Sequence, residues 1–161
     1  MMNNATLSSY GIYQNIALSS LLLIEYVKTY QEETSKEVDF SRLLIVLPFC
    51  YTEVLAIQSN GKSNKIKGLI NLIEENKVIF QSLPLQVSEL FSDLTKTIQI
   101  GSNLSALDFD TQSLTVKYLK TNKKFSSTNK EVFELIKASR KLAKWVSKLT
   151  EVEYVSFFNL K

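Results

Sequence analysis

Few residue types in this chain could carry out chemistry, because the sequence contains no His and a single Cys. Without His there is no Ser-His-Asp triad, no Cys-His dyad and no His-containing zinc site. The lone Cys50 also excludes an internal disulfide, a CxxC redox pair and an all-cysteine zinc cluster. It lies in an apolar run, where a free Cys behaves as a small, buried and inert hydrophobe. The residue types alone therefore exclude most nucleophilic, redox and zinc chemistry.

Two short motifs remain as candidates for chemistry. Gly61-Lys62-Ser63 resembles the end of a phosphate-binding P-loop, but Ala56 stands where that loop needs its first Gly, after a run that reads as helix. Asp108 and Asp110 fall on one face of an expected strand and could give two oxygens to magnesium, but no third acidic residue is near in sequence. We interpret both motifs as turn chemistry. We therefore expect no enzyme activity, no cofactor and no metal.

The clearest pattern lies in residues 129–149, which we expect to form a helix that begins with a capping box of Thr128 and Glu131. Basic side chains recur three or four residues apart on one face, and apolar side chains occupy the opposite face. We expect the basic face to contact either DNA phosphates or an acidic protein surface; the alternative is an ordinary solvated face. With the preceding loop, the basic set is Lys120, Lys123, Lys124, Lys137, Arg140, Lys141, Lys144 and Lys148.

The chain that positions this helix has the size and composition of one globular domain. It has 161 residues, of which 45% are hydrophobic and 22% are charged. Residues 1–60 carry 3 basic and 6 acidic side chains, whereas residues 102–161 carry 11 and 6. This asymmetry predicts two surfaces with different partners, unless it is ordinary sequence drift.

Apolar segments flank the domain at both ends. After a polar tail (residues 1–14), an apolar helical segment covers residues 15–58. Its first helix, residues 15–30, is apolar on more than one face, so it is buried either centrally or against a partner. Pro48 predicts a kink, or two short helices that meet there. An apolar segment, residues 150–161, closes the sequence and is expected to dock. The side chains expected at a protein interface are Leu21, Leu22, Val27, Phe157, Phe158 and Leu160.

Residues 65–118 show the order of a winged helix-turn-helix. A short helix ends near Asn76, a second begins with Pro84 in its first turn and stops near Gly101, and alternating residues 107–118 form a hairpin with its turn at 110–113. We therefore predict a mainly α fold with a small β-hairpin: a single compact helical domain over residues 1–161 with winged helix-turn-helix-like topology. The second helix carries Glu89 and Asp93 beside Lys96, which suits protein better than DNA.

Three stretches together resemble a known family. They are Asn15–Leu18, the apolar run Leu43–Pro48, and Lys137–Trp145, which is similar to an Ala…Lys-Leu-Gly-x-Trp pattern before a short apolar C-terminus. The sequence departs from that pattern at Ala143, where the family often has Gly, and at Val146, where an aromatic residue often follows. The family is the middle component of ABC three-component systems, the small subunit encoded with an SMC-like ATPase and an effector in Lamassu-type bacterial antiphage defence.

The resemblance implies a non-enzymatic adaptor. Its implied partners are an SMC-like ATPase subunit, a nuclease-type effector subunit, and DNA reached through the complex without sequence reading. No catalytic residue is carried over, because the family's chemistry belongs to the partner subunits. The alternative is a stand-alone winged-helix DNA-binding transcriptional regulator.

We expect a cytoplasmic location and no membrane contact. The longest apolar runs are well below the roughly 20 residues that span a bilayer. No basic residue precedes Lys28, so the positive region of a signal peptide is lacking.

Overall fold

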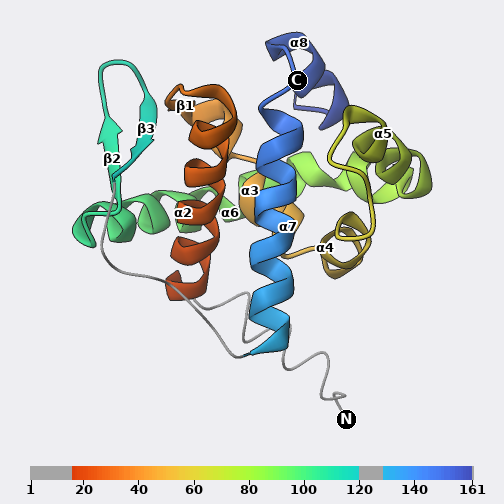
Figure 1. Cartoon of the computed structure of the whole chain (residues 1–161), viewed down its shortest axis with the longest axis horizontal. Helices are drawn as coiled ribbons and strands as arrows, with labels where there is room; N and C mark the ends of the chain where they lie inside the picture. Colours follow the sequence, from red (N-terminus) through yellow and green to blue (C-terminus); the bar gives the residue numbers. More distant parts are fainter. Residues whose placement is uncertain (1–15, 120–128, 161) are drawn as a thin grey trace.

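Helices make up most of the chain in the computed structural model, which describes residues 16–119 and 129–160 (Figure 1). The expected tail, residues 1–14, lies outside the described residues. The prediction of a mainly α fold with a small β element is confirmed. In chain order the elements are α2 (Ile16–Thr34), β1 (Val38–Asp39), a 3-10 helix η1 (Phe40–Leu43), α3 (Val46–Cys50), α4 (Glu53–Ser59), α5 (Ile66–Glu75), α6 (Lys77–Asn103), β2 (Leu107–Asp110), β3 (Thr115–Tyr118), α7 (Lys130–Val146) and α8 (Glu151–Phe157).

Two long helices, α2 and α7, lie side by side in the centre of the molecule, and α6 crosses behind them (Figure 1). Ser139 on α7 donates a hydrogen bond of 2.7 Å to the backbone carbonyl of Leu22 on α2, so the two helices touch closely. Their buried faces form one core with α3, α4 and α8. The largest buried side chains in this core are Trp145, Tyr26, Tyr154, Phe49, Phe80 and Phe158.

Helix α2 is buried because neighbours cover it on several sides. Helices α3, α6 and α7 and strand β3 all pack against it, which matches an apolar surface that extends beyond one face. Of the two alternatives left by the sequence, central burial in this domain is the one that the structure has. Leu22 and Val27 are both 0% exposed, so these two expected interface residues lie in the chain's own core, whereas Leu21 is half-buried.

A three-stranded antiparallel sheet of order β1-β3-β2 packs beside α2. The predicted hairpin is confirmed, with Leu107 opposite Tyr118 and Phe109 opposite Val116. Strand β1 adds a third strand by placing Val38 opposite Val116. Strand β1 falls within the predicted apolar helical segment, residues 15–58, where no strand is predicted, because a strand of two residues is too short to show alternation.

Helix α6 departs furthest from the sequence prediction, because it begins at Lys77. Pro84 therefore lies inside the helix and has no N–H to donate to the carbonyl of Phe80, one turn earlier. The side-chain amide of Asn159, just after α8, donates to that carbonyl at 3.2 Å. The prediction that Pro84 lies in the first turn is wrong, because a distant side chain supplies the hydrogen bond that the proline removes.

The expected winged helix-turn-helix topology is not confirmed. A single residue, Asn76, separates α5 from α6, in place of the three or four residues of a usual turn. Helix α6 also continues past Gly101 to Asn103. It ends where Ser105 takes a left-handed φ of 57°, with the Ala106 N–H bonded to the Gly101 carbonyl at 3.0 Å. One long helix thus replaces the predicted one of residues 84–101.

The apolar segment after β1 breaks at Tyr51–Thr52 rather than at Pro48. Pro48 lies in the first turn of α3, where a missing N–H is harmless. The Thr52 hydroxyl donates to the Pro48 carbonyl at 2.7 Å, and the chain bends by 99° between Phe40–Cys50 and Glu53–Ser59. Within the described ranges no single helix is long and apolar enough to cross a membrane, although this bent pair passes by length and composition.

Candidate functional site: the cationic face of helix α7

Helix α7 begins at a side-chain cap. The Asn129 side-chain oxygen accepts hydrogen bonds from the backbone N–H groups of Glu131, at 2.9 Å, and Val132, at 3.3 Å. These N–H groups have no partner inside the helix, so the cap stabilises its first turn. Thr128, the expected cap, lies outside the described residues. The helix ends at Val146, so most of the predicted 129–149 helix is confirmed.

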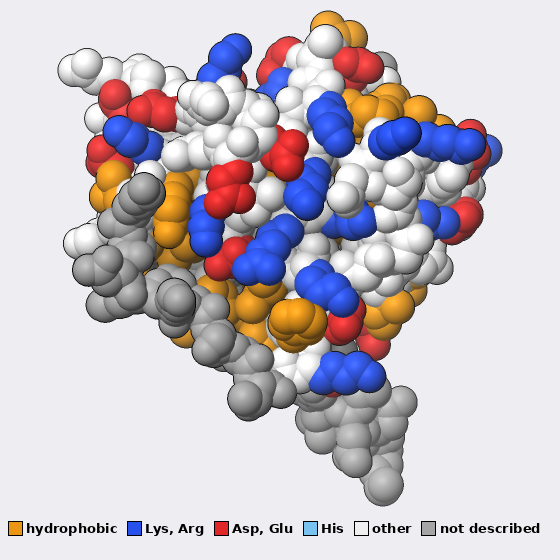
Figure 2. Space-filling view, in the orientation of Figure 1, with side chains coloured by type: hydrophobic (Ala, Val, Ile, Leu, Met, Phe, Trp, Pro, Cys, Tyr) orange, Lys and Arg blue, Asp and Glu red, His pale blue; other side chains and the backbone are white. Residues whose placement is uncertain are grey.

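One face of α7, continued into the turn that follows it, carries Lys137, Lys141, Lys144 and Lys148; we call this set the cationic face. Figure 2 shows Lys and Arg side chains along the exposed side of α7 and over the neighbouring α5 region. The opposite side of the helix is buried against α2, α3 and α4. The amphipathic division that the sequence predicts for this helix is therefore confirmed.

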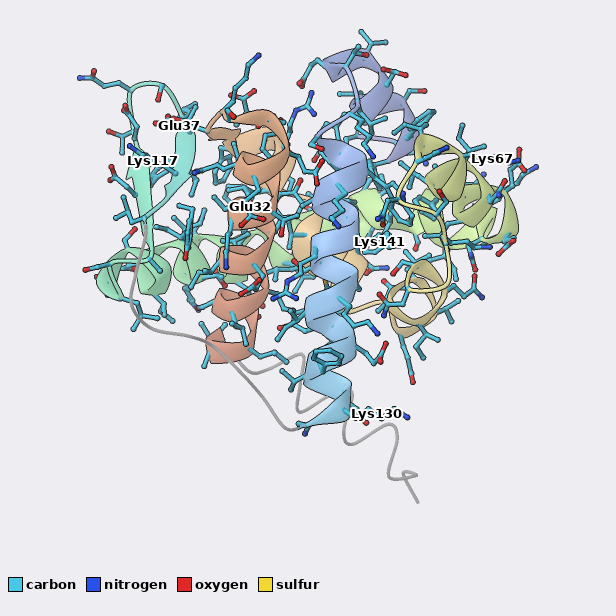
Figure 3. All side chains as sticks on the ribbon, viewed as in Figure 1. Glu32, Glu37, Lys67, Lys117, Lys130 and Lys141 are labelled. Carbon is cyan, nitrogen blue, oxygen red and sulfur yellow. The ribbon has the colours of Figure 1, made fainter. Side chains whose placement is uncertain are left out.

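Two lysines of the cationic face, together with Trp145, hold residues 62–64 by three consecutive backbone carbonyls. The Lys141 Nζ donates to the Lys62 carbonyl at 2.6 Å, the Trp145 Nε1 to that of Ser63 at 2.9 Å, and the Lys148 Nζ to that of Asn64 at 2.8 Å. We call this segment the 62–64 loop. Lys141 is labelled on α7 in Figure 3.

A glycine lets the 62–64 loop approach α5 closely. A Cβ added at Gly68 would lie 2.1 Å from the Ser63 carbonyl oxygen, which is an impossible distance. The loop is thus pressed between Gly68 on one side and α7 on the other. Because it turns carbonyl oxygens, not N–H groups, towards the lysines, it lacks the anion-binding geometry of a P-loop. The interpretation of Gly61-Lys62-Ser63 as a turn is consistent with this arrangement.

The lysines of the cationic face influence one another. Partial burial lowers the pKa of Lys141, and the charges of Lys144 and Lys137 lower it further. Lys137 lies 3.5 Å from a carboxylate oxygen of Glu134 and 5.2 Å from the centre of the Phe133 ring. A polyanion bound here would relieve the mutual repulsion of these ammonium groups.

Arg140 lies beside the cationic face but is already paired. Its Nε donates to a carboxylate oxygen of Glu25 at 2.9 Å, and the Glu25 side chain is 8% exposed, so this ion pair joins α7 to α2. Arg140 was expected among the DNA or acidic-partner contacts. Its charge is balanced within the chain, which leaves it less positive charge to offer a partner.

Three further lysines, which the sequence pattern did not single out as contact residues, extend the positive surface. Lys62, Lys65 and Lys67 precede or begin α5, and the 62–64 loop brings this segment to α7. Lys62 is paired with Glu75 at 2.7 Å. Among the described residues, Lys65, Lys67 and Lys144 have no ion-pair partner. The only sequence signal was the density of lysines around the turn.

The remaining predicted contact residues fall into two groups. Lys120, Lys123 and Lys124 lie outside the described residues. At the other end, Phe158 is 0% exposed in the core, while Phe157 and Leu160 are half-buried against it. The expected docking of the 150–161 segment is thus a docking onto this chain's own core, through α8.

The candidate chemical residues have structural explanations. Asp110 accepts hydrogen bonds from the N–H groups of Gln112, at 2.8 Å, and Ser113, at 3.3 Å, which lowers its pKa and fits the predicted turn. Burial raises the pKa of the Cys50 thiol to about 12, as expected for an inert core cysteine. In residues 16–119 and 129–160, no group of three Cys, Asp or Glu side chains could hold a metal. The geometry favours surface contact through ammonium groups.

Comparison with known families gives one match. The family described as ABC-three component (ABC-3C) system Middle Component 3 matches residues 3–161. No curated protein and no solved structure was found to match.

Proposed function

Because this chain belongs to the Middle Component 3 family of ABC-three component systems, we propose that it is a non-enzymatic accessory subunit that links an ABC ATPase component to an effector component. The match over residues 3–161 is the observation that carries this proposal. The buried thiol of Cys50 and the lack of His support a role without chemistry of its own. In finer detail, we propose a Lamassu-type defence complex with an SMC-like ATPase and a nuclease-type effector, acting in the cytoplasm.

The cationic face gives this proposal a physical role. Ammonium groups on one side of α7 can bind DNA phosphates held by the ATPase without reading the base sequence. Lys144, Lys65 and Lys67 supply charge that no described carboxylate neutralises. Helix α6 is less suited to DNA, because Glu89 and Asp93 offset the charges of Lys77 and Lys96 and the helix carries no net positive charge.

Assembly is tested by co-expressing the chain with the ATPase component of its system and purifying through a tag on the ATPase. We expect the two chains to elute together in size-exclusion chromatography. If the chain elutes alone as a homodimer that protects one DNA sequence, the alternative of a stand-alone regulator replaces this proposal.

DNA contact is tested with charge reversals that spare the 62–64 loop. Lys141 and Lys148 hold that loop, so the informative pair is Lys137→Glu with Lys144→Glu. Because each lost phosphate contact lowers the salt dependence, we expect the slope of log K against log salt for duplex DNA to fall by roughly two units. The matched control reverses Lys36 and Lys96, which are exposed elsewhere on the chain, and should leave the slope unchanged.

An unchanged slope in the Lys137 and Lys144 variant, with the complex still assembled, removes DNA from the proposal. If the variant instead loses the ATPase while the control keeps it, the cationic face contacts an acidic protein surface. The accessory role survives either outcome, because it depends on assembly.

A further inference from the structure

An exposed aromatic ring stands in the row of lysines on α7. Phe133 lies four residues before Lys137 and eleven before Lys144. Because residues at these spacings share one side of a helix, the ring lies on the same side as the two ammonium groups. Phe133 is 48% exposed, and Figure 2 shows hydrophobic surface among the Lys and Arg side chains on this part of the molecule. The cationic face and Phe133 thus form one mixed surface.

The ring of Phe133 is presented to solvent without an aromatic partner. Of the exposed large hydrophobic side chains in the described ranges, only Phe91 and Phe133 are aromatic. Phe91 meets the Phe40 ring edge-to-face at 6.0 Å, whereas no ring in residues 16–119 or 129–160 stacks on that of Phe133. The Lys137 Nζ lies over the Phe133 ring, 5.2 Å from its centre. With half of the residue exposed, ring surface remains for a flat ligand.

The acidic side chain next to Phe133 already has partners in the chain. A carboxylate oxygen of Glu134 accepts a hydrogen bond of 2.9 Å from the side-chain amide of Asn60, just after α4. The other oxygen lies 3.5 Å from the Lys137 Nζ. Lys144 has no ion-pair partner among the described residues. The surface around Phe133 therefore keeps an excess of positive charge.

A flat ring among ammonium groups suits a nucleic acid strand whose bases are unpaired. An aromatic side chain stacks on the face of any base while cations hold the neighbouring phosphates, so this binding needs no particular sequence. In a duplex, adjacent base pairs cover the faces of each base, which leaves nothing for the ring to stack on. From Phe133 to Lys144 the row is about 16 Å long, which spans several nucleotides at roughly 3.4 Å per stacked base.

We propose that the cationic face binds single-stranded DNA, with one unpaired base stacked on Phe133 and adjoining phosphates held by Lys137 and Lys144. This refines the proposed DNA contact of the accessory subunit and rests on it. Lysines alone contact the phosphates of paired and unpaired DNA alike. The ring adds a preference for unpaired bases, so the surface distinguishes opened DNA from duplex DNA.

The experiment measures the fluorescence anisotropy of labelled oligo-dT, which cannot pair with itself, and of a blunt duplex of equal length, each titrated with the full chain. The decisive variant is Phe133→Leu, because leucine keeps an apolar side chain but has no flat face. We expect it to weaken oligo-dT binding roughly tenfold, within the loss that removal of one stacking ring causes. Duplex binding should not change. Phe133→Trp keeps a flat ring and should bind oligo-dT at least as well as wild type.

Phe91→Leu is the matched control. Phe91 is 47% exposed, almost as much as Phe133, but lies on α6 outside the cationic face. This variant should bind both DNAs as wild type does. Lys137→Glu with Lys144→Glu should weaken binding to both, because both DNAs carry phosphates. The ring and the lysines are thereby tested separately.

The proposal is overturned if wild type does not bind oligo-dT, or if Phe133→Leu binds it as tightly as wild type does. It is also overturned if oligo-U is bound much more tightly than oligo-dT, which would make the ligand RNA. Loss of ATPase co-purification by Phe133→Leu, with oligo-dT binding intact, would make the ring a protein contact. Failure of the accessory function is distinguishable from all of these, because the wild-type chain then does not co-purify with the ATPase.

Discussion

Arg42 fastens η1 to the carboxyl-terminal end of α7. Its Nη1 donates to the Val146 carbonyl at 2.7 Å and its Nη2 to the Leu149 carbonyl at 2.9 Å. The guanidinium also lies 5.4 Å from the centre of the Tyr154 ring. The Val146 carbonyl, the last of α7, also accepts the Leu149 N–H at 3.0 Å, so Arg42 gives it a second hydrogen bond. The buried cation also complements the dipole of α7 at this end. Arg42 is 7% exposed, so water cannot easily replace it.

Replacement of Arg42 by Met should therefore lower the free energy of unfolding by about 4 kcal/mol. Two charge-assisted hydrogen bonds contribute roughly 3–6 kcal/mol, and stacking on the tyrosine ring adds about 0.5–1 kcal/mol. The variant no longer pays the desolvation cost of a buried guanidinium, which offsets part of that loss. The ion pair with Glu151, at 3.6 Å and 60% exposed on the carboxylate side, adds little. A drop of this size corresponds to a fall in Tm of roughly 8–16 °C.

The assay is urea unfolding monitored by far-UV circular dichroism for wild type, Arg42→Met and Arg42→Lys. The three are compared with one shared value of m, the slope of the free energy of unfolding against urea concentration. Lysine keeps the charge but can reach only one carbonyl at a time, so Arg42→Lys should lose about half as much stability. Lys67→Met, an exposed change on α5, is the control and should stay within about 0.5 kcal/mol. A loss below about 1 kcal/mol for Arg42→Met, or equal losses for both Arg42 variants, would refute the reasoning.

Three further outcomes follow from contacts described above. Gly68→Ala should displace the 62–64 loop, lower the free energy of unfolding by about 1–3 kcal/mol and shift the tryptophan fluorescence. Gly61→Ala is the control: a Cβ there would lie 3.7 Å from its nearest neighbour, the Gln58 carbonyl oxygen, so this variant should be nearly neutral in the same urea titration. Asn159→Asp removes the amide donor to the Phe80 carbonyl and should lower the urea midpoint by an amount equivalent to about 1 kcal/mol. Burial raises the pKa of Cys50 to about 12, above its unfolded value of 9.0. Its protonated thiol therefore stabilises the fold fully below pH 9.0, and this stabilisation is lost as the pH rises towards 12. The fall in the urea midpoint at alkaline pH should be shallower in Cys50→Ala than in wild type, and equal slopes would contradict this.

The sequence predicted the elements whose patterns are local. The helix at α7 and the hairpin at Phe109 follow from periodicity and turn residues within a few positions of each other. Central burial of α2 was one of two predicted alternatives, the other being burial against a partner. A helix that is apolar on several faces must be covered, but its sequence does not show whether its own domain or another chain covers it. The packing of α3, α6, α7 and β3 against α2 decides between them.

What the sequence missed depends on contacts between distant positions. Pro84 breaks a helix by local rules, but Asn159 supplies the hydrogen bond from 75 positions away, and no local pattern predicts that. The candidate site shows the same limit. Lys141 and Lys148 were expected to face a partner, yet each also holds a carbonyl of the 62–64 loop, which is remote in sequence. Periodicity places side chains on a face but cannot tell whether a neighbouring loop already uses them.

The bonds from α7 to the 62–64 loop also bear on how tightly an anion could be held. An ammonium group has three N–H donors, and Lys141 and Lys148 each give one to a backbone oxygen. Two donors of each remain, on side chains whose rotamers the loop has already fixed. A freely moving lysine loses roughly 1.5–2 kcal/mol of rotamer entropy on immobilisation. These two have lost much of it on folding, so an incoming phosphate would meet charges that are pre-organised for it.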